Sequence, residues 1–479
     1  MKTTSLALLS TLFATVAGAQ EFPGIRTGNY TGVGGAFTNP ANVADSRHSW
    51  SVNLLGFHAA VGNNNASFKL DDLKGGFDSD DFKDKLTGSG AGLTTAQINT
   101  TIYGPSFMIS GKKSGVAFTT RARVMLNAKE IDGNLAERLT TDESDNTSFT
   151  IDASAANQRV NVNAWTEFGA SYGRTLMEQG EHFLKGGVTL KYLAGAANAY
   201  IGIGNLTGQV IYDPITDNSY LANSTGRMQV GFGGVNIDDF ELSDLTSFKS
   251  TGVGGDIGFV YEYRPAALND YNPASNKYKL RVGVSLLDLG SINYKRDVSR
   301  SGAYDIGITG PERLNLDELK NEDIDDIKGF FDARPNYFSP VAGMSAGNYK
   351  VSLPTSLNLD VDYRVNKNVY INLAGMFAMS NADSKIYNAF AYNSVTLTPR
   401  IETGNMGLYV PIQYNELTNF NAGVAVRLGP LFLGSGSILS VLTGSSKQAD
   451  AFFGIRFGGL RKEKAKKSES SGSVNEIGI

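Results

Sequence analysis

The sequence predicts an all-β fold, a transmembrane antiparallel β-barrel of about 14 strands with an N-terminal plug segment. Three observations favour this fold class. Apolar and polar residues alternate with period two in many segments, and the connections between these segments are alternately short and long along the chain. After an apolar leader at the N-terminus, no stretch reaches the roughly 20 apolar residues that a membrane helix needs.

The clearest predicted strand covers residues 350–363, where apolar residues at odd positions alternate with polar residues at even positions. In residues 116–126, Arg121 and Arg123 alternate with apolar neighbours. Every backbone group of a closed barrel is paired, so only the side chains distinguish the lipid face from the lumen face. The same period marks residues 160–172, 184–194, 253–263, 278–286, 369–379, 420–428 and 451–457, and more weakly 49–62, 98–111, 392–403, 406–414 and 431–438.

The connections predict which ends of the strands face the periplasm. Short turns are expected at residues 112–114, 177–182, 366–367, 404–405 and 429–430, and long extracellular loops at 63–97, 131–157, 201–249 and 295–348. Residues 205–234 are typical of a hairpin, and residues 315–331 have helix-like spacing. An outward girdle of tyrosines is expected at the periplasmic strand ends, formed by Tyr172, Tyr261, Tyr263, Tyr278 and Tyr363.

Four parts of the chain are expected. Residues 1–19 have the charged start, apolar middle and small-residue end of a signal peptide. Residues 20–48 form an N-terminal plug or periplasmic segment, 49–460 the barrel, and 461–479 a disordered basic and polar tail. The cysteine count of zero fits the envelope of a Gram-negative bacterium, so we expect the chain in the cell outer membrane.

Several function classes are not expected. The three histidines have no acid and hydroxyl nucleophile at a spacing that one strand face would bring together, so we predict no enzyme, no metal site and no cofactor. A net charge of −4 gives no argument for nucleic acid as a partner. Glycine clusters at residues 32–35, 202–208 and 231–234 have no following helix pattern, and indicate turns, bulges or close backbone approach.

The predicted lumen-facing residues include charges of both signs. Paired across the lumen, such charges fill and stabilise the interior, whereas a ladder that guides a substrate is the alternative. The principal lumen-facing charges are Arg121, Arg123, Asp256, Glu262, Asp360, Asp362 and Arg400, together with Glu167, Lys185, Lys191, Lys279, Arg281, Glu402, Arg427 and Arg456.

Residues 22–45 precede the first membrane strand and contain the motif GGAF at residues 34–37, closely followed by NPA at 39–41. This motif resembles the N-terminal element of the long-chain fatty-acid transporter superfamily of outer-membrane barrels. More closely, the chain resembles a family of uncharacterised outer-membrane proteins that carry a domain of unknown function. The matching stretches are residues 22–45, 278–294, 353–363 and 427–435.

The resemblance implies about 14 strands and an N-terminal plug inside the barrel. Within the plug motif, Phe37, Asn39 and Pro40 are the candidate ligand-binding or gating residues. The expected function is passive transport of a small apolar molecule through a plugged lumen. The alternative is a non-transporting envelope scaffold or partner protein for secretion or surface assembly. The expected partners are membrane lipid, an apolar small-molecule ligand and an envelope protein.

Overall fold

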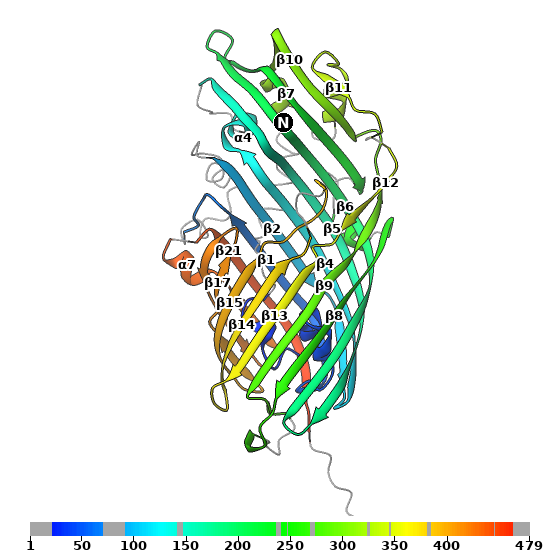
Figure 1. The fold of residues 1–479 in the computed structure, drawn as a ribbon, viewed down its shortest axis with the longest axis vertical. Coiled ribbons are helices and arrows are strands. Elements are labelled where there is room, and N and C mark those ends of the chain that lie inside the picture. Colours follow the sequence, from blue (N-terminus) through cyan, green and yellow to red (C-terminus); the bar gives the residue numbers. More distant parts are fainter. Residues whose placement is uncertain are drawn as a thin grey trace, which may run out of the picture.

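A computed structural model of the chain shows a closed antiparallel β-barrel with a tall sheet rising above part of its rim (Figure 1). The structure describes residues 22–69, 92–140, 147–235, 241–246, 248–268, 274–322, 326–343, 346–380, 385–444 and 446–462. The predicted signal peptide lies outside these residues, as does the predicted tail from residue 463 onward. No helix within the described residues is long and apolar enough to cross a membrane.

Within the described residues, the barrel wall consists of fourteen antiparallel segments, which we call staves, each formed by one strand or by two consecutive strands. This confirms the predicted fold class. Antiparallel pairing of β1 with both β2 and β21 closes the ring. Some staves consist of two consecutive strands. In chain order the staves are β1 (His48–Asn63), β2 (Leu93–Tyr103) with β3 (Ser106–Ser110), β4 (Ser114–Asp132), β5 (Phe149–Gln179), β6 (His182–Asp213), β8 (Ser250–Tyr263), β9 (Leu280–Lys295), β12 (Asn348–Ser352) with β13 (Ser356–Arg364), β14 (Val369–Ala378), β15 (Ser394–Glu402), β16 (Met406–Tyr409) with β17 (Ile412–Asn415), β18 (Asn419–Ala422) with β19 (Val424–Leu428), β20 (Leu431–Ser435) and β21 (Gln448–Leu460).

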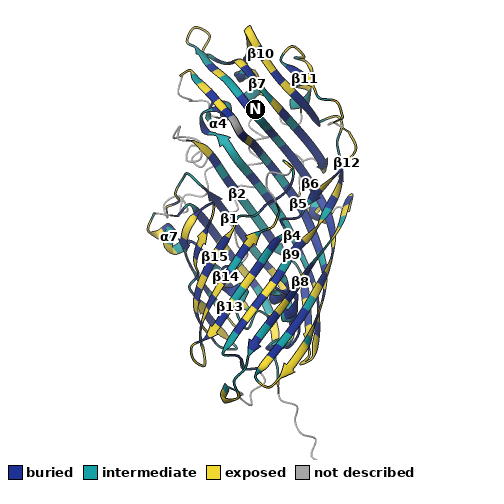
Figure 2. Cartoon of the chain, viewed as in Figure 1, coloured by how far each residue is buried: buried dark blue, intermediate teal, exposed yellow. Residues whose placement is uncertain are grey.

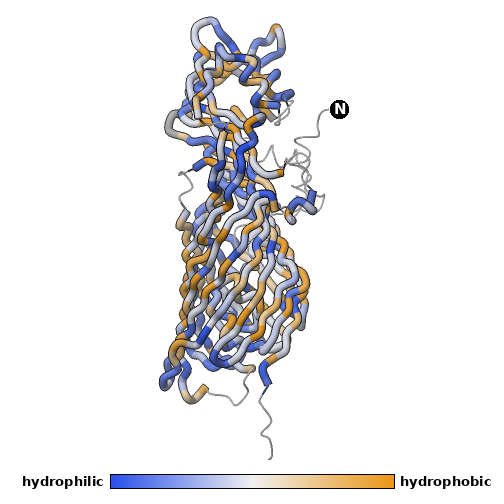
Figure 3. Tube along the Cα trace, turned by 90° about the vertical axis from the view of Figure 1, so that its right-hand side faces the viewer, coloured by the Kyte–Doolittle hydropathy of each residue, from blue (hydrophilic) through white to orange (hydrophobic). Residues whose placement is uncertain are grey.

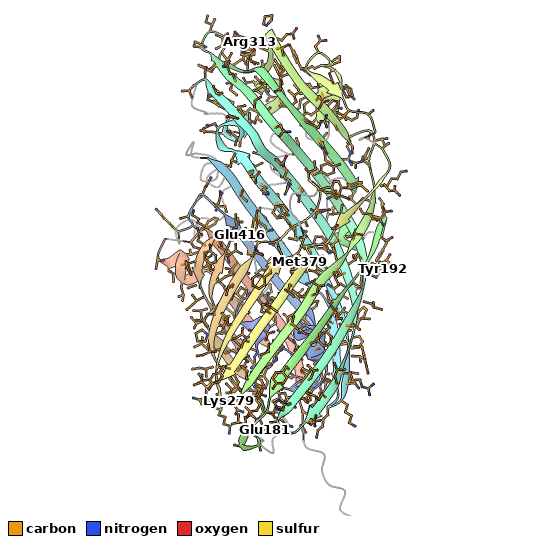
Figure 4. All side chains as sticks on the ribbon, in the orientation of Figure 1. Glu181, Tyr192, Lys279, Arg313, Met379 and Glu416 are labelled. Carbon is orange, nitrogen blue, oxygen red and sulfur yellow. The ribbon has the colours of Figure 1, made fainter. Side chains whose placement is uncertain are left out.

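Side chains alternate between the two faces of the barrel wall. On β13, Leu359 and Val361 are exposed outward while Asn358 and Asp362 are buried inside. Figure 2 shows this alternation along the lower strands, and Figure 3 shows the matching alternation of hydropathy. The ten residues of β14 span about 33 Å, close to the reach of a transmembrane strand. In Figure 4 the part of the barrel with this length, which would cross the membrane, lies between Lys279 near the lower end and Met379 at mid-height.

Outward tyrosines lie at the lower strand ends, with one exception. Tyr172 and Tyr363 are exposed, and Tyr261 and Tyr263 are partly exposed. The prediction for Tyr278 is wrong, because its side chain is buried and faces the lumen. β9 begins at Leu280, so Tyr278 precedes the strand and does not follow its alternation.

The tall sheet corrects the prediction of long loops. β5 and β6 contain 31 and 32 residues, and they continue above the other staves. There they pair with β7 (Asn218–Gly234), which pairs with β10 (Gly302–Asn315) and through it with β11 (Phe338–Pro340). Much of residues 131–157, 201–249 and 295–348 is therefore strand. The predicted hairpin at 205–234 is confirmed by the β6–β7 pair.

The tall sheet has its own apolar core, in which Tyr304, Phe331 and Phe338 pack together. Short helices contribute to this core: α4 (Gly133–Thr140), α5 (Leu316–Lys320) and α6 (Ile327–Asp332). α5 and α6 confirm the helix-like spacing predicted for residues 315–331, of which 323–325 lie outside the described residues. Apart from three short helices in the N-terminal segment, the remaining described helices are η4 (Leu242–Thr246), η5 (Ala266–Leu268) and α7 (Ile438–Leu442).

Candidate functional site

The N-terminal segment, residues 22–47, lies inside the lower half of the barrel (Figure 1, dark blue). It contains three 3-10 helices: η1 (Ile25–Thr27), η2 (Gly32–Phe37) and η3 (Pro40–Val43). η3 packs against β5, β6 and β8, and η2 packs against β1, β3 and β4. The segment therefore lies against the inner face of six neighbouring strands without pairing as a strand.

A row of four glycines forms the seat of η3. Gly115 faces Gly173 across β4 and β5, Gly173 faces Gly187 across β5 and β6, and Gly187 faces Gly258 across β6 and β8. A β-carbon at Gly187 would lie 2.5 Å from the amide nitrogen of Ala41, and one at Gly173 would lie 2.8 Å from a methyl group of Val43. Since no side chain fits between the wall and η3, the row permits direct backbone contact.

Asn39 joins η3 to the wall. Its side-chain oxygen accepts a hydrogen bond from the amide of Ala41 at 2.9 Å, which caps η3, and Pro40 occupies the first helical turn. Its side-chain nitrogen donates to the carbonyl oxygens of Phe259 (3.0 Å) and Val284 (3.1 Å) on β8 and β9. One buried amide thus fixes both the helix start and its position in the barrel.

Above η2, a buried ion network consists of three cations and three carboxylates: Arg121, Arg123, Lys191, Glu167, Asp256 and Asp288. Asp288 lies at its centre, 2.8 Å from both Arg121 and Arg123 and 2.5 Å from Lys191. The guanidinium of Arg121 also lies 5.4 Å from the ring centroid of Phe37. The six formal charges cancel, so the network fills the lumen with paired charge.

Sequence reasoning missed Asp288 because a β-bulge reverses its direction. The β8–β9 register shifts between the pairs Gly255–Leu289 and Ile257–Leu286, so two residues of β9 lie opposite Asp256. Asp288 has a φ of 58°, in the left-handed region that Asp tolerates better than most residues. In an unbroken strand this carboxylate would share the outward face of Val284 and Leu286. The bulge turns it into the lumen.

The N-terminal segment also contacts a second buried cluster. Arg400 forms two hydrogen bonds with Asp362, at 2.8 and 2.5 Å, and a third with Glu402 at 3.1 Å. The amide nitrogen of Asn29 donates to Glu402 at 3.1 Å, and the hydroxyl of Tyr278 lies within hydrogen-bond distance of the side-chain oxygens of Asn29 and Asp362, to one of which it donates. Tyr278 therefore links the N-terminal segment to the wall, which explains its burial.

A third cluster holds the end of the N-terminal segment. Arg264 lies 2.7 Å from Asp45 and 2.6 Å from Glu262, and Arg47 lies 2.9 Å from Asp45. Burial alone would raise the pKa of Asp45, but Arg47 and Arg264 outweigh it and lower the pKa to about 2. The amine of Lys185 donates to the carbonyl of Ala44 at 2.8 Å.

Asp360 belongs to a separate ion pair that also contacts the N-terminal segment. It accepts a hydrogen bond from Arg281 at 2.7 Å, and Arg281 also donates to the side chain of Asn42 at 2.8 Å. Each predicted lumen-facing charge of the principal set therefore lies in the barrel interior, within one of four ion-paired groups. Three of these groups contact the N-terminal segment by hydrogen bonds, and the Asp288 network contacts it through Phe37.

Two small cavities lie on opposite sides of the segment. The upper one, of about 80 Å³, is lined by Phe37, Arg121 and Asp288, and the lower one, of about 50 Å³, by Asp45 and Glu262. Arg26 and Thr38 line both cavities and therefore form the constriction between them. Each cavity has room for one or a few water molecules, at roughly 30 Å³ each, and is much smaller than a typical small-molecule pocket.

The chain's family follows from its sequence match. The model of a family of unknown function (DUF5723) matches residues 40–436. The chain belongs to this family. The match begins at Pro40 on the glycine row and ends just after β20, so the family pattern covers η3 and most of the barrel.

Solved structures with similar folds are barrels. The chain is similar to a Pseudomonas aeruginosa FadL homologue (11% identity, 92% of this chain and 95% of the other, TM-score 0.40). It is also similar to the toluene transporters TodX of P. putida (10%, 90% and 95%, 0.40) and TbuX of Ralstonia pickettii (9%, 90% and 94%, 0.37). No curated protein matches this DUF5723 chain.

At the upper mouth of this DUF5723 barrel, the connection between β14 and β15 folds inward. The side chain of Gln97 donates to the carbonyl of Phe390 at 2.7 Å. Further along the same wall, beyond β4 and β5, Asn198 on β6 donates to the carbonyl of Tyr387 at 3.1 Å. This inward connection was not predicted, because the sequence pattern gives no signal for the direction of a loop.

Among the described residues, no group of three or more His, Asp or Glu side chains is arranged to hold a metal ion. The interior carboxylates named above are engaged by arginine, lysine, tyrosine or amide donors, as the ion pairs around Asp288 and Asp362 show. What the arrangement offers chemically is a closed, hydrogen-bonded seat for the N-terminal segment.

Proposed function

We propose that this DUF5723 protein is an integral outer-membrane barrel that passes a small, largely apolar molecule passively, with the N-terminal segment as its gate. The outward apolar band of the lower strands supports insertion into a lipid bilayer. Since β1 begins and β21 ends at the same lower end, the short-turn end is assigned to the periplasm. Membrane lipid is then the permanent partner of the outward face.

The observation that carries the proposal is the constriction at Arg26 and Thr38. Arg26 donates a hydrogen bond to Asn358 on β13 at 2.7 Å, and the carbonyl of Thr38 accepts one from Ser285 on β9 at 2.7 Å. These contacts close the path between the two cavities. Residues 22–44 of the segment are held by hydrogen bonds that involve side chains and by packing, so their movement would leave the barrel's backbone ladder intact.

The polarity of the side chains that line the two cavities indicates which class of ligand could pass. The upper cavity combines apolar groups of Phe37, Met125 and Leu287 with the charged groups of Arg121 and Asp288. The lower cavity is lined mainly by polar and charged side chains. This combination favours a molecule with an apolar body and a polar group over a pure hydrocarbon. Because the cavities are small, passage requires the N-terminal segment to shift.

The test is uptake of N-phenylnaphthylamine, a dye that fluoresces after it crosses the lipopolysaccharide layer, by cells expressing the protein. Arg26→Ala removes the side chain that closes the constriction, so uptake should be faster than with the wild type. Arg227→Ala is the matched control, because Arg227 forms an exposed ion pair in the tall sheet. Equal uptake by Arg26→Ala and the control would contradict the proposal.

The tall sheet favours a second candidate function, a scaffold that binds another envelope protein. Its apolar core, built around Phe331 and Phe338, stabilises a projecting structure that a pore does not need. Deletion of this sheet together with its helices should abolish affinity isolation of a stoichiometric partner while uptake of the dye persists. If no partner is isolated with the full chain, this candidate is rejected.

A further inference from the structure

The barrel wall has a notch at its lower rim, beside the last residues of β21. β21 pairs with β1 as far as Leu460, the partner of His48, but with β20 only as far as Ile455, the partner of Leu431. One further backbone hydrogen bond runs from the amide of Arg456 to the carbonyl of Pro430, at 2.8 Å. Beyond it, no strand of the part of the chain that the structure describes pairs with β21 on the β20 side.

A cavity of about 210 Å³ lies behind this notch. Its lining includes Tyr30, His48, Arg427, Arg456, Gly404 and Leu460. The side chain of Leu460 spans the notch, because a β-carbon at Gly404 would lie 2.8 Å from its δ-carbon. The flexible side chain of Leu460 therefore lines the cavity where β21 meets the turn at Gly404. The cavity is several times larger than a water molecule's share of liquid volume, roughly 30 Å³.

Two arginines line this cavity without a carboxylate partner within salt-bridge distance among the described residues. Arg427 is 6% exposed and donates to the carbonyls of Thr403 (2.6 Å) and Gly404 (3.0 Å), while its Nε has no hydrogen-bond partner. Arg456 donates to the carbonyl of Thr31. This pattern differs from the interior networks described above, where ion pairs balance the cations.

Further groups around the cavity complete a site for an anion. His48 is 9% exposed, and its Nδ1 has no hydrogen-bond partner. The guanidinium of Arg427 lies 5.3 Å from the ring centroid of Tyr30, and that of Arg456 lies 4.6 Å from the ring centroid of Phe432. These rings fix the planes of both guanidinium groups, and such planar donors suit phosphate oxygens.

The rim of the notch is apolar on its outer side. Phe457 is 44% exposed and Trp50 is 48% exposed, both on the lipid-facing side of the wall. Trp50 packs over Gly459, near the end of β21. Tryptophan is enriched where a barrel crosses the membrane interface, which is the level of lipid phosphate groups. The cationic cavity therefore opens at the height of the headgroups.

We propose that this notch binds the phosphate group of a membrane phospholipid between Arg427 and Arg456, with the acyl chains along the outward face beside Phe457. The inference rests on the proposed membrane placement, but not on the gate. A free phosphate ion would share the two arginines, but it would gain nothing from the apolar rim. The proposal therefore assigns a lipid headgroup.

The experiment measures how much phosphatidylglycerol the delipidated full chain retains after gel filtration in an uncharged detergent. About one lipid per chain is expected. Diacylglycerol, which has the same tails and no phosphate, should not be retained, and inorganic phosphate at millimolar concentration should not displace the phospholipid. Retention of diacylglycerol, or displacement by inorganic phosphate alone, would overturn the assignment.

Arg427→Gln and Arg456→Gln should each weaken retention about tenfold, because each removes charge-assisted hydrogen bonds. Arg227→Gln should retain the lipid as the wild type does, since Arg227 lies in the tall sheet. If Arg427→Gln does not fold, Asn405→Trp fills the cavity from its exposed rim while keeping both arginines. Normal retention by Asn405→Trp and Arg456→Gln would refute the site. Dye uptake should be unchanged in Asn405→Trp, which keeps the hydrogen bond from Arg456 to Thr31, so the site and the gate fail separately.

Discussion

A β-carbon on Gly258 would lie 2.7 Å from the γ-carbon of Asn39 and would overlap its side-chain oxygen. The side chain of Asn39 therefore lies directly against the backbone of the barrel wall at Gly258. Gly258→Ala should dislodge η3 and destabilise the folded state by about 1–3 kcal/mol, the usual cost of overpacking. The midpoint of thermal unfolding in detergent measures this change.

Gly307→Ala is the control for this substitution, because a β-carbon there meets nothing within 4 Å. Its unfolding midpoint should match that of the wild type. A second readout is cleavage of residues 22–45 by a protease added from the lower side, which Gly258→Ala should accelerate. Equal unfolding midpoints and equal cleavage rates for both variants would contradict the claim that the glycine row holds η3 against the wall.

Asp288→Asn tests the balanced ion network. The carboxylate of Asp288 lies within 2.8 Å of Arg121, Arg123 and Lys191, so its neutralisation leaves an uncompensated buried positive charge. Loss of one partner of a buried ion network destabilises by about 3–5 kcal/mol. Asp305→Asn breaks an exposed pair with Arg227 and should leave the unfolding midpoint close to that of the wild type. Similar unfolding midpoints for the two variants would contradict the network's role.

The pH dependence of the N-terminal segment should follow Asp45. Its pKa is lowered from 3.8 to about 2, so its contribution is complete above the ordinary value and is lost as pH falls through the lower one. That difference corresponds to about 2 kcal/mol. The rate of hydrogen exchange in residues 22–47, corrected for the intrinsic rate, should therefore rise as the pH is lowered from about 5 to about 2.

Asp45→Asn is the control for the pH experiment. Asp45 has a φ of 47°, which Asn also tolerates, so the backbone should be retained while the titrating group is lost. Exchange in the variant should be faster at the higher pH and should depend less on pH. The prediction fails if the variant keeps the pH dependence of the wild type.

Adjacent positions of β13 test the membrane placement. Leu359 is 41% exposed on the outer face, whereas Asn358 is 6% exposed on the inner face. In this cysteine-free chain, Leu359→Cys should react with a lipid-soluble maleimide and not with a charged one. Asn358→Cys should be protected from the lipid-soluble reagent. Rapid labelling of residue 359 by the charged reagent would place β13 outside a bilayer.

Alternation predicted the staves because each side chain of a barrel strand has one of two environments. Val361 and Asp362 show this on β13, where the apolar residue is outside and the acid is inside. The strand count follows from local patterns of this kind. The same reasoning places the charges of Arg121 and Arg400 in the lumen, where the structure has them.

The interior could not be predicted to the same depth, because it depends on register between strands. The glycine row exists only when Gly173 of β5 lies opposite both Gly115 and Gly187, and a single strand pattern carries no register. The bulge at Asp288 and the buried side chain of Tyr278, which precedes β9, are likewise departures from period two. Apart from the hairpin at residues 205–234, the tall sheet was not predicted, because its strands pack against short helices and do not follow the lipid-and-lumen alternation.

The most direct test of the gate is a reversible lock between Asn39 and Gly258. The γ-carbon of Asn39 lies 2.7 Å from the position of a β-carbon at residue 258, so Asn39→Cys with Gly258→Cys brings two sulfur atoms within bonding reach. The account predicts that the oxidised double variant takes up N-phenylnaphthylamine no faster than cells without the protein, and that a reducing agent restores uptake in the same cells. Uptake that is equal in the oxidised and reduced states, with the disulfide verified by mass spectrometry, would contradict the N-terminal segment as the gate.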